Sequence, residues 1–101
     1  MAETLRQRTL RLLRERGLRA TKRLGQHFLV DEGVARDIVA AAELREDDSV
    51  LEIGAGLGAL TEHLAQVARR VVAVEIDRGI AAVLRELAGE PPVELLHADF
   101  L

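Results

Sequence analysis

Residues 50–60, VLEIGAGLGAL, decide the fold, because they place a short apolar run directly before three closely spaced glycines. The apolar run predicts a β-strand, and the glycines predict a sharp turn after it. Leu57 and Leu60 then begin a helical spacing of apolar residues. Residues 70–77, RVVAVEID, form a nearly continuous β-branched run, which is typical of a strand buried on both faces. The sequence therefore predicts a strand–helix–strand unit.

The same pattern continues through one more helix and one more strand. Asp77 predicts the N-cap of the helix, and Gly89 with the proline pair after it predicts the end. Residues 93–101, VELLHADFL, predict the third strand. Neighbouring parallel strands need crossovers, so the βαβαβ order predicts an α/β protein with a parallel sheet, the Rossmann-like half of a doubly wound fold.

Two helices are predicted before the first strand. An apolar face surrounded by arginines predicts a helix over residues 3–16, and Gly17 is placed where a left-handed helix stop would fall. Asp31 offers an N-cap to a second helix over residues 32–43. Its apolar positions predict a stripe that faces the core: Val34, Ala35, Ile38, Val39 and Ala42.

Charge divides the chain into two parts. Residues 1–23 carry eight Lys or Arg against two Glu, a net charge of +6, and the other 78 residues carry −9. We therefore expect a basic N-terminal helix and linker over residues 1–23 and a Rossmann-like cofactor domain over residues 24–101. A basic arm is typical of proteins that contact a polyanion, although a solvated amphipathic helix has the same charges.

Composition excludes several classes of protein. The 101 residues contain no Cys, which excludes disulfides and thiolate metal sites, and the three His are far apart in sequence, so no metal is expected. Charged residues interrupt every apolar stretch well before the ~20 residues that a membrane-spanning helix needs. The Arg-rich start lacks the features of a signal peptide. We expect a soluble, cytoplasmic protein with no membrane partner.

The glycine turn and a later acid form the first candidate site. Gly54 and Gly56 allow a tight turn and a close approach of the backbone to a ligand, at the edge where open α/β sheets bind ligands. Amides at the start of the next helix can receive an anion. Glu75 follows Gly56 by 19 positions, near the ~20-residue spacing at which an acid reaches a ribose diol. The predicted ligand therefore carries a ribose.

Two cofactors fit this spacing. The string GAGLGA also satisfies G-x-G-x-x-A, the fingerprint of nicotinamide dinucleotides, so NAD is an alternative. Glu52 favours S-adenosyl-L-methionine, because negative charge suits an ammonium and a sulfonium but not a pyrophosphate. Asp99, near the end of the third predicted strand, could accept a hydrogen bond from an adenine amino group.

Four motifs follow one another in order. They are KRLGQHFLVDEGVARDIVAAAEL at 22–44, VLEIGAGLGALT at 50–61, VVAVEIDR at 71–78 and HADFL at 97–101. Together they resemble the ribosomal RNA adenine N6,N6-dimethyltransferase family, the bacterial small-subunit enzymes in particular. The resemblance implies the S-adenosylmethionine-binding half of a class I methyltransferase fold, with ribosomal RNA as partner.

The resemblance also implies a role for individual positions in the cofactor site. A loop of the GQ-x-FL type would close over the methionine part of the cofactor. Its middle position is most often Asn in the family and is His here, and an imidazole can still donate a hydrogen bond. The implied residues are Gln26, His27 and Leu29 for methionine, Gly54 and Gly56 for the turn, Glu75 for ribose, and Ile76, Asp99 and Phe100 for adenine.

The family's base-positioning segment, Asn-Leu/Ile-Pro-Tyr/Phe, would hold a flipped-out adenine, and no such segment occurs here. The sequence contains no Asn and no Tyr. We therefore expect a truncated domain that binds cofactor, with methyl transfer absent or very weak and no catalytic residue assigned. The rival interpretation is a non-catalytic RNA-binding module that uses the basic arm. An open sheet edge also predicts a homodimer.

Overall fold

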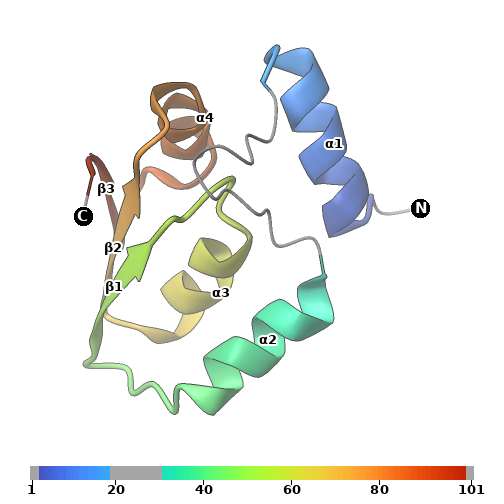
Figure 1. Cartoon of the computed structure of the whole chain (residues 1–101). Helices are drawn as coiled ribbons and strands as arrows, with labels where there is room; N and C mark the ends of the chain where they lie inside the picture. The colour runs from blue at the N-terminus through green and yellow to red at the C-terminus, as the bar shows by residue number, and fades with distance from the viewer. Residues whose placement is uncertain (1–2, 19–30, 100–101) are drawn as a thin grey trace.

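The computed structural model describes residues 3–18 and 31–99 and contains a three-stranded parallel sheet. Its strands are β1 (Ser49–Ile53), β2 (Arg70–Glu75) and β3 (Val93–His97). They lie in the order β1-β2-β3, with β2 in the centre (Figure 1). All three carboxyl ends therefore meet at one edge of the sheet, as the predicted order of elements requires.

Two crossover helices, α3 (Ala59–Val67) and α4 (Arg78–Ala88), pack on the same face of the sheet. Leu64 of α3 and Leu84 of α4 belong to one buried cluster with the strand residues that face them. This arrangement confirms the predicted α/β class and its βαβαβ unit. Alternate strand residues face the other way, and three of them are about half exposed: Leu51, Ile53 and Leu96.

The residues predicted to cap the helices do so. Asp77 accepts a hydrogen bond of 2.9 Å from a backbone N–H in the first turn of α4, and Gly89 is the C-cap of that helix. Asp31 accepts a bond of 3.1 Å at the start of α2 (Glu32–Ala41). These caps explain why the boundaries could be predicted closely from sequence.

The stripe predicted for α2 is only partly buried. Ala35 is fully buried against the neighbouring helix α3, but Val34 and Ile38 are 44% and 45% exposed, and Ala42 is exposed. The helix packs on the rest of the molecule chiefly through α3, so a narrower face than the full stripe is covered. The prediction that Val34, Ile38 and Ala42 face the core is therefore wrong.

The third strand is shorter than its predicted range of 93–101. β3 ends at His97, and the Ala98 N–H donates the last backbone hydrogen bond to β2, at 3.1 Å from the carbonyl of Glu75. Beyond Glu75 the chain of β2 turns into α4, so it offers β3 no further partner. A strand without a neighbour to pair with ends there.

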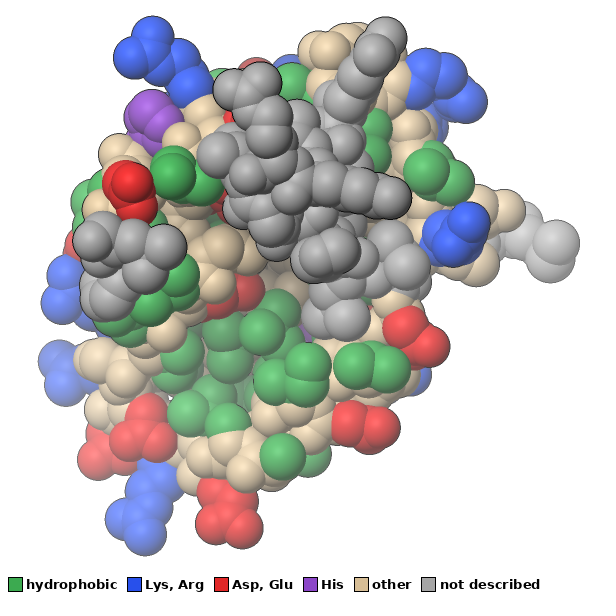
Figure 2. All heavy atoms as spheres, in the orientation of Figure 1, with side chains coloured by type: hydrophobic (Ala, Val, Ile, Leu, Met, Phe, Trp, Pro, Cys, Tyr) green, Lys and Arg blue, Asp and Glu red, His purple; other side chains and the backbone are tan. Residues whose placement is uncertain are grey.

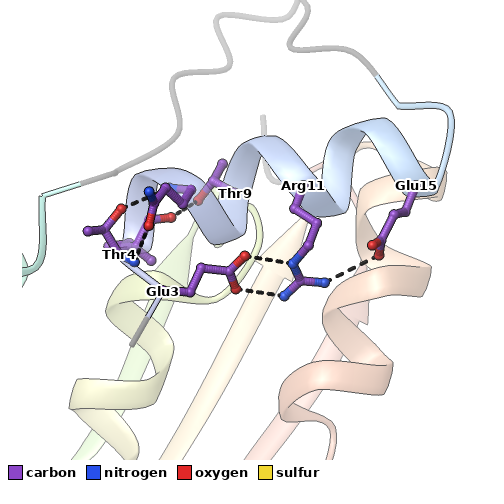
Figure 3. Close-up of polar contacts among 7 residues, drawn as sticks. Glu3, Thr4, Thr9, Arg11 and Glu15 are labelled. Atoms are coloured by element: carbon purple, nitrogen blue, oxygen red, sulfur yellow. Dashed lines mark hydrogen bonds and ion pairs between the residues drawn. The ribbon is translucent and has the colours of Figure 1, made fainter. Parts of the chain in front are cut away.

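The basic helix α1 (Leu5–Glu15) packs against the start of the α/β unit. Its Leu12 is buried in a cluster with Leu57, Ile80 and Val83, which come from the glycine turn and α4. Figure 3 shows α1 lying across α3 and α4. No helix among residues 3–18 and 31–99 is long and apolar enough to cross a bilayer.

Ion pairs fix both ends of α1 to the acidic body. Arg8 lies 3.1 Å from Glu62 of α3, and Arg16 lies 2.5 Å from Glu86 of α4. The basic and acidic parts inferred from charge are therefore in contact. The predicted boundary at residue 23 falls within residues 19–30, outside the described residues, so the division into two parts stays a prediction.

Candidate functional site

The sheet places the predicted site residues of all three strands at one edge. Gly54 directly follows β1, and Glu75 is the last residue of β2. Glu75 pairs in register with His97, the last residue of β3, and Asp99 follows two residues later. This is the carboxyl edge, where open α/β sheets bind their ligands.

The glycine turn is fixed to β2 by its backbone. The N–H groups of Gly54 and Ala55 both donate to the carbonyl of Val74, at 2.8 and 3.1 Å. Gly54 has a φ of 75°, which favours glycine. A Cβ added at Gly54 would meet no atom of the described residues within 4 Å, so this part of the chain leaves the space above Gly54 open to a ligand.

The third glycine of the turn serves packing. Gly58 is the N-cap of α3 with a φ of 86°, and a Cβ added there would lie 2.8 Å from Cδ1 of Leu84. That distance is too short for a carbon–carbon contact. Gly58 therefore allows α3 to lie close to α4 and is not a candidate ligand contact.

Glu75 is buried, with 2% of its surface exposed, and its carboxylate connects the glycine turn to the end of β2. Oε1 accepts from the N–H of Gly56 at 2.8 Å, and Oε2 accepts from the N–H of Asp77 at 3.0 Å. Glu75 thus orders the turn at the place where the sequence predicts ribose binding.

The adenine end of the predicted site lies at the ends of β2 and β3. Ile76 follows β2 and is 39% exposed, as an apolar contact for a ring requires. His97 donates from Nε2 to the Ile76 carbonyl at 2.9 Å, which ties the two strand ends together. Asp99 is exposed beyond them. The structure brings these residues to one edge, and their contacts with a ligand stay predictions.

Beneath the turn is a second buried carboxylate. Glu52 of β1 is 8% exposed, and its Oε1 accepts a hydrogen bond of 2.5 Å from Oγ1 of the fully buried Thr61. Burial raises the pKa of Glu52, and the Thr61 hydrogen bond partly opposes this effect. The sequence suggested Glu52 as a negative charge near the ligand. It did not indicate that Thr61 of α3 would form a hydrogen bond with Glu52.

A cavity of about 120 Å³ connects Glu52 with the glycine turn and with α1. Leu5 and Thr9 of α1 form its outer wall, and residues of the turn and of α3 form the rest. Ligand pockets for whole small molecules usually have about 300–1,000 Å³, so this cavity fits one end of an extended ligand. The sequence predicted the apolar face of α1 but not that this face would cover the turn.

Four predicted residues lie outside the described residues: Gln26, His27, Leu29 and Phe100. Their roles therefore rest on the sequence resemblance alone. Among residues 3–18 and 31–99, no cluster of three or more His, Asp or Glu has an arrangement that could hold a metal ion.

Comparison with protein families assigns most of this chain to one group. The model of the ribosomal RNA adenine dimethylase family matches residues 17–101. Among curated relatives, ribosomal RNA small subunit methyltransferase A of Thermotoga neapolitana is 52% identical over 90 residues, which cover 88% of this chain and 35% of that protein. The protein of the same name from Moorella thermoacetica is 53% identical over 95 residues, with coverages of 93% and 33%.

Solved structures of similar proteins have the same fold. The 23S rRNA methyltransferase ErmE superposes with a TM-score of 0.68 at 48% identity, over 73% of this chain and 31% of that one. A dimethyladenosine transferase from Plasmodium falciparum has a TM-score of 0.67 at 31% identity, over 73% and 28%. These matches confirm a Rossmann-like class I methyltransferase fold.

The chain spans about a third of the length of these curated relatives. The match nevertheless includes the glycine turn, Glu75 and Asp99, the residues that the fold brings to one edge. The chain therefore belongs to the ribosomal RNA adenine dimethylase family.

Proposed function

We propose that this chain is the S-adenosylmethionine-binding part of a ribosomal RNA adenine N6,N6-dimethyltransferase. The observation that carries the proposal is the pair of buried carboxylates, Glu52 and Glu75, on either side of an open glycine turn in a member of this family. A ribose diol suits Glu75, and a cationic group suits Glu52. The whole protein's substrate, ribosomal RNA, is proposed from the names of the relatives.

The described residues fit the proposed cofactor along the carboxyl edge. Gly54 leaves open space for the ligand, and the carboxylate of Glu75 lies at the glycine turn, where it would accept from the ribose hydroxyls. Asp99 would accept from the adenine amino group, and Ile76 would lie against the ring. From the resemblance, Gln26, His27 and Leu29 would close over the methionine part, and Phe100 would flank the adenine.

The cofactor supplies a methyl group on a sulfonium, so transfer depends mainly on alignment and on exclusion of water. Glu75 contributes alignment, because the carboxylate that would bind the ribose also fixes the glycine turn. Leu5 and Thr9 of α1 contribute shielding, since they cover the cavity beside Glu52. The described residues would therefore align the donor and shield one side of it.

NAD is the alternative ligand that the glycine pattern allows. Its pyrophosphate would approach a turn that lies beside the buried carboxylate of Glu52, which lines the adjoining cavity. Like charges in a poorly solvated site repel each other, so this geometry disfavours NAD. The relatives and solved structures described above are methyltransferases, which also supports the methyl donor.

RNA binding through α1 alone is the weaker candidate. Arg8, Arg11 and Arg16 are engaged in ion pairs with carboxylates of this chain, which reduces the positive charge available to phosphates. We also propose a homodimer that would pair the open edge of β1 and cover the adjoining face of the sheet, where Leu51 and Ile53 are exposed. Light scattering that shows only monomer at millimolar concentration would contradict it.

Calorimetry on the 101-residue chain tests the proposed function. We expect binding of S-adenosylmethionine and no binding of NAD under the same conditions. Binding of NAD without S-adenosylmethionine would overturn the assignment. With tritiated cofactor and unmodified small-subunit RNA we expect no multiple turnover, because no Asn-Leu/Ile-Pro-Tyr/Phe segment occurs among these residues. Repeated turnover would show that other residues position the base.

A further inference from the structure

Thr61 and Glu52 form a buried polar pair that joins α3 to β1. Thr61 is fully buried, and its hydroxyl donates to Glu52 Oε1 at 2.5 Å. The other buried threonine among the described residues, Thr9 of α1, instead donates to the carbonyl of Leu5 one helical turn earlier, at 2.8 Å. Thr9 is thus satisfied within its own helix, as buried threonines in helices often are. Thr61 bonds a side chain on another element.

The charged side chains around Glu52 are engaged elsewhere. On α1, Arg8 pairs with Glu62, which is itself on α3. His63, also on α3, lies 3.5 Å from Glu32 of α2. At the end of β2, Glu75 accepts from the backbone N–H groups of Gly56 and Asp77. In the part of the chain that the structure describes, no Lys, Arg or His is paired with Glu52, and Thr61 is its recorded hydrogen-bond donor.

A buried carboxylate loses its hydration. When no cation is paired with it, the ionised form is costly in free energy. Burial accordingly raises the pKa of Glu52, and the hydroxyl of Thr61 acts against that rise because it stabilises the ionised form. The same bond fixes Oε1, so the direction of the carboxylate beside the cavity is set. Carboxylates beside cavities whose pKa is shifted by burial are often found at functional sites.

We propose that Thr61 is a positioning residue that holds the Glu52 carboxylate as a counter-charge for the cationic end of the ligand, and so sets a preference for a sulfonium over a neutral thioether. This role rests on the proposed cofactor function. Because Glu52 lines the cavity under the glycine turn, a cation bound there would meet an acceptor already oriented and shielded from water. The preference for the charged ligand would therefore depend on Thr61 of α3, which does not contact the ligand itself but orients Glu52.

The test compares S-adenosylmethionine with S-adenosylhomocysteine, which lacks the sulfonium charge, by calorimetry from about pH 5 to about pH 8. Thr61→Val removes the hydroxyl with little change in volume. We expect about a 10-fold loss of affinity for S-adenosylmethionine near neutral pH, as for a hydrogen bond to a charged group, and a smaller loss for S-adenosylhomocysteine. The pH below which S-adenosylmethionine binding weakens should move upward, and Thr61→Ser should restore both properties.

A double-mutant cycle separates this role from simple packing. If Thr61 acts through Glu52, Thr61→Val should not change the preference between the two ligands once Glu52→Gln is present. His63→Gln removes the imidazole of α3 as a control, and it should leave the upward shift in place. Thr61→Val could fail to fold, so a second measurement uses wild type and Thr61→Ser. In both proteins, NMR measures the pKa of the Glu52 carboxyl with and without S-adenosylmethionine. A Glu52 pKa that S-adenosylmethionine does not lower would then overturn the proposal.

The outcomes distinguish this role from the proposed function. Equal weakening of both ligands in Thr61→Val, with an unchanged pH profile, would overturn the role of Thr61 while the wild type still binds cofactor. If the effects of Thr61→Val and Glu52→Gln on binding are additive in the double mutant, the proposed role of Thr61 is also overturned. No binding of S-adenosylmethionine by wild type would overturn the proposed function itself, and with it a role for Thr61 toward this ligand.

Discussion

The carboxylates on the helical surface and those at the carboxyl edge of the sheet are satisfied in different ways. On the surface, Arg11 bonds Glu3 at 2.7 Å and Glu15 at 3.3 Å, as Figure 3 shows. The hydrogen bond from Arg11 lowers the pKa of Glu3. At the edge, the hydroxyl of Thr61 donates to Glu52, and the backbone N–H groups of Gly56 and Asp77 donate to Glu75.

This difference separates structural charges from charges held for a ligand. A surface ion pair neutralises its acid within the protein and contributes little, because water and salt screen it. The hydroxyl of Thr61 orients the buried carboxylate of Glu52 without neutralising it, so the ionised form of this acid is available to a cationic ligand. Figure 2 shows exposed charges of the surface kind: acidic and basic side chains are scattered around the rim of an apolar patch over α2, α3 and β1.

The largest expected effect follows from removing the acid that serves both turn and ligand. Glu75→Ala should weaken S-adenosylmethionine binding by about 100-fold or more, because charged hydrogen bonds to two hydroxyls are lost and Gly56 is released. Calorimetry measures the loss. The matched control is Glu94→Ala on β3, an exposed acid paired with Arg70 at 2.8 Å, which should bind as wild type does. Similar losses in both variants would remove the distinction between the two kinds of acid.

A second prediction concerns stability against pH. Burial raises the pKa of Glu52, so the folded state binds a proton more tightly there than the unfolded chain does. This contribution to stability is complete below the unfolded pKa of about 4.5 and is lost as pH rises through the folded value. Glu52→Gln should therefore become progressively more stable than wild type as pH rises across that window, while it loses affinity for S-adenosylmethionine.

Thermal unfolding at several pH values measures this effect, and each kcal/mol at the midpoint corresponds to about 4–8 °C for a domain of this size. Glu94→Gln is the control with the opposite sign, because Arg70 lowers the pKa of Glu94. Its stability relative to wild type should not rise with pH. If Glu52→Gln is less stable than wild type at neutral pH, the ionised carboxylate stabilises the fold, which contradicts this prediction.

The smallest expected effect belongs to a surface pair. Arg16 at the end of α1 and Glu86 of α4 are both exposed, and Arg16→Ala breaks the ion pair between them. The unfolding temperature should fall only slightly, and the difference should vanish near 1 M salt, where the Debye length is about 3 Å. Cofactor binding should be unchanged. A large loss of cofactor affinity would mean that this contact controls how α1 covers the cavity.

The sequence predicted what depends on local pattern and on the topology of parallel strands. Asp77 and Gly89 mark the ends of α4, and the strand–turn–helix order alone brings Gly54 and Glu75 to one edge. The bond between Thr61 and Glu52 could not be predicted, because it depends on how α3 rotates over β1. The place of α1 over the glycine turn was missed for a similar reason.

Periodicity also overestimated burial. The apolar spacing of α2 marks a face that can be covered, but it does not identify what covers it, and Ile38 is 45% exposed. The third strand was predicted too long because the pattern of residues 93–101 does not indicate where β2 stops offering a partner. Both errors concern tertiary contacts, not the choice between helix and strand.

Amide chemical-shift mapping of the 101-residue chain with S-adenosylmethionine tests the central claim most directly. We predict that the largest shifts fall on Gly54, Gly56 and the amides around Glu75 and Asp99, and that the outer surface of α1 around Arg11 changes little. Shifts centred on the arginine-bearing surface of α1, with the glycine turn unchanged, would contradict the account.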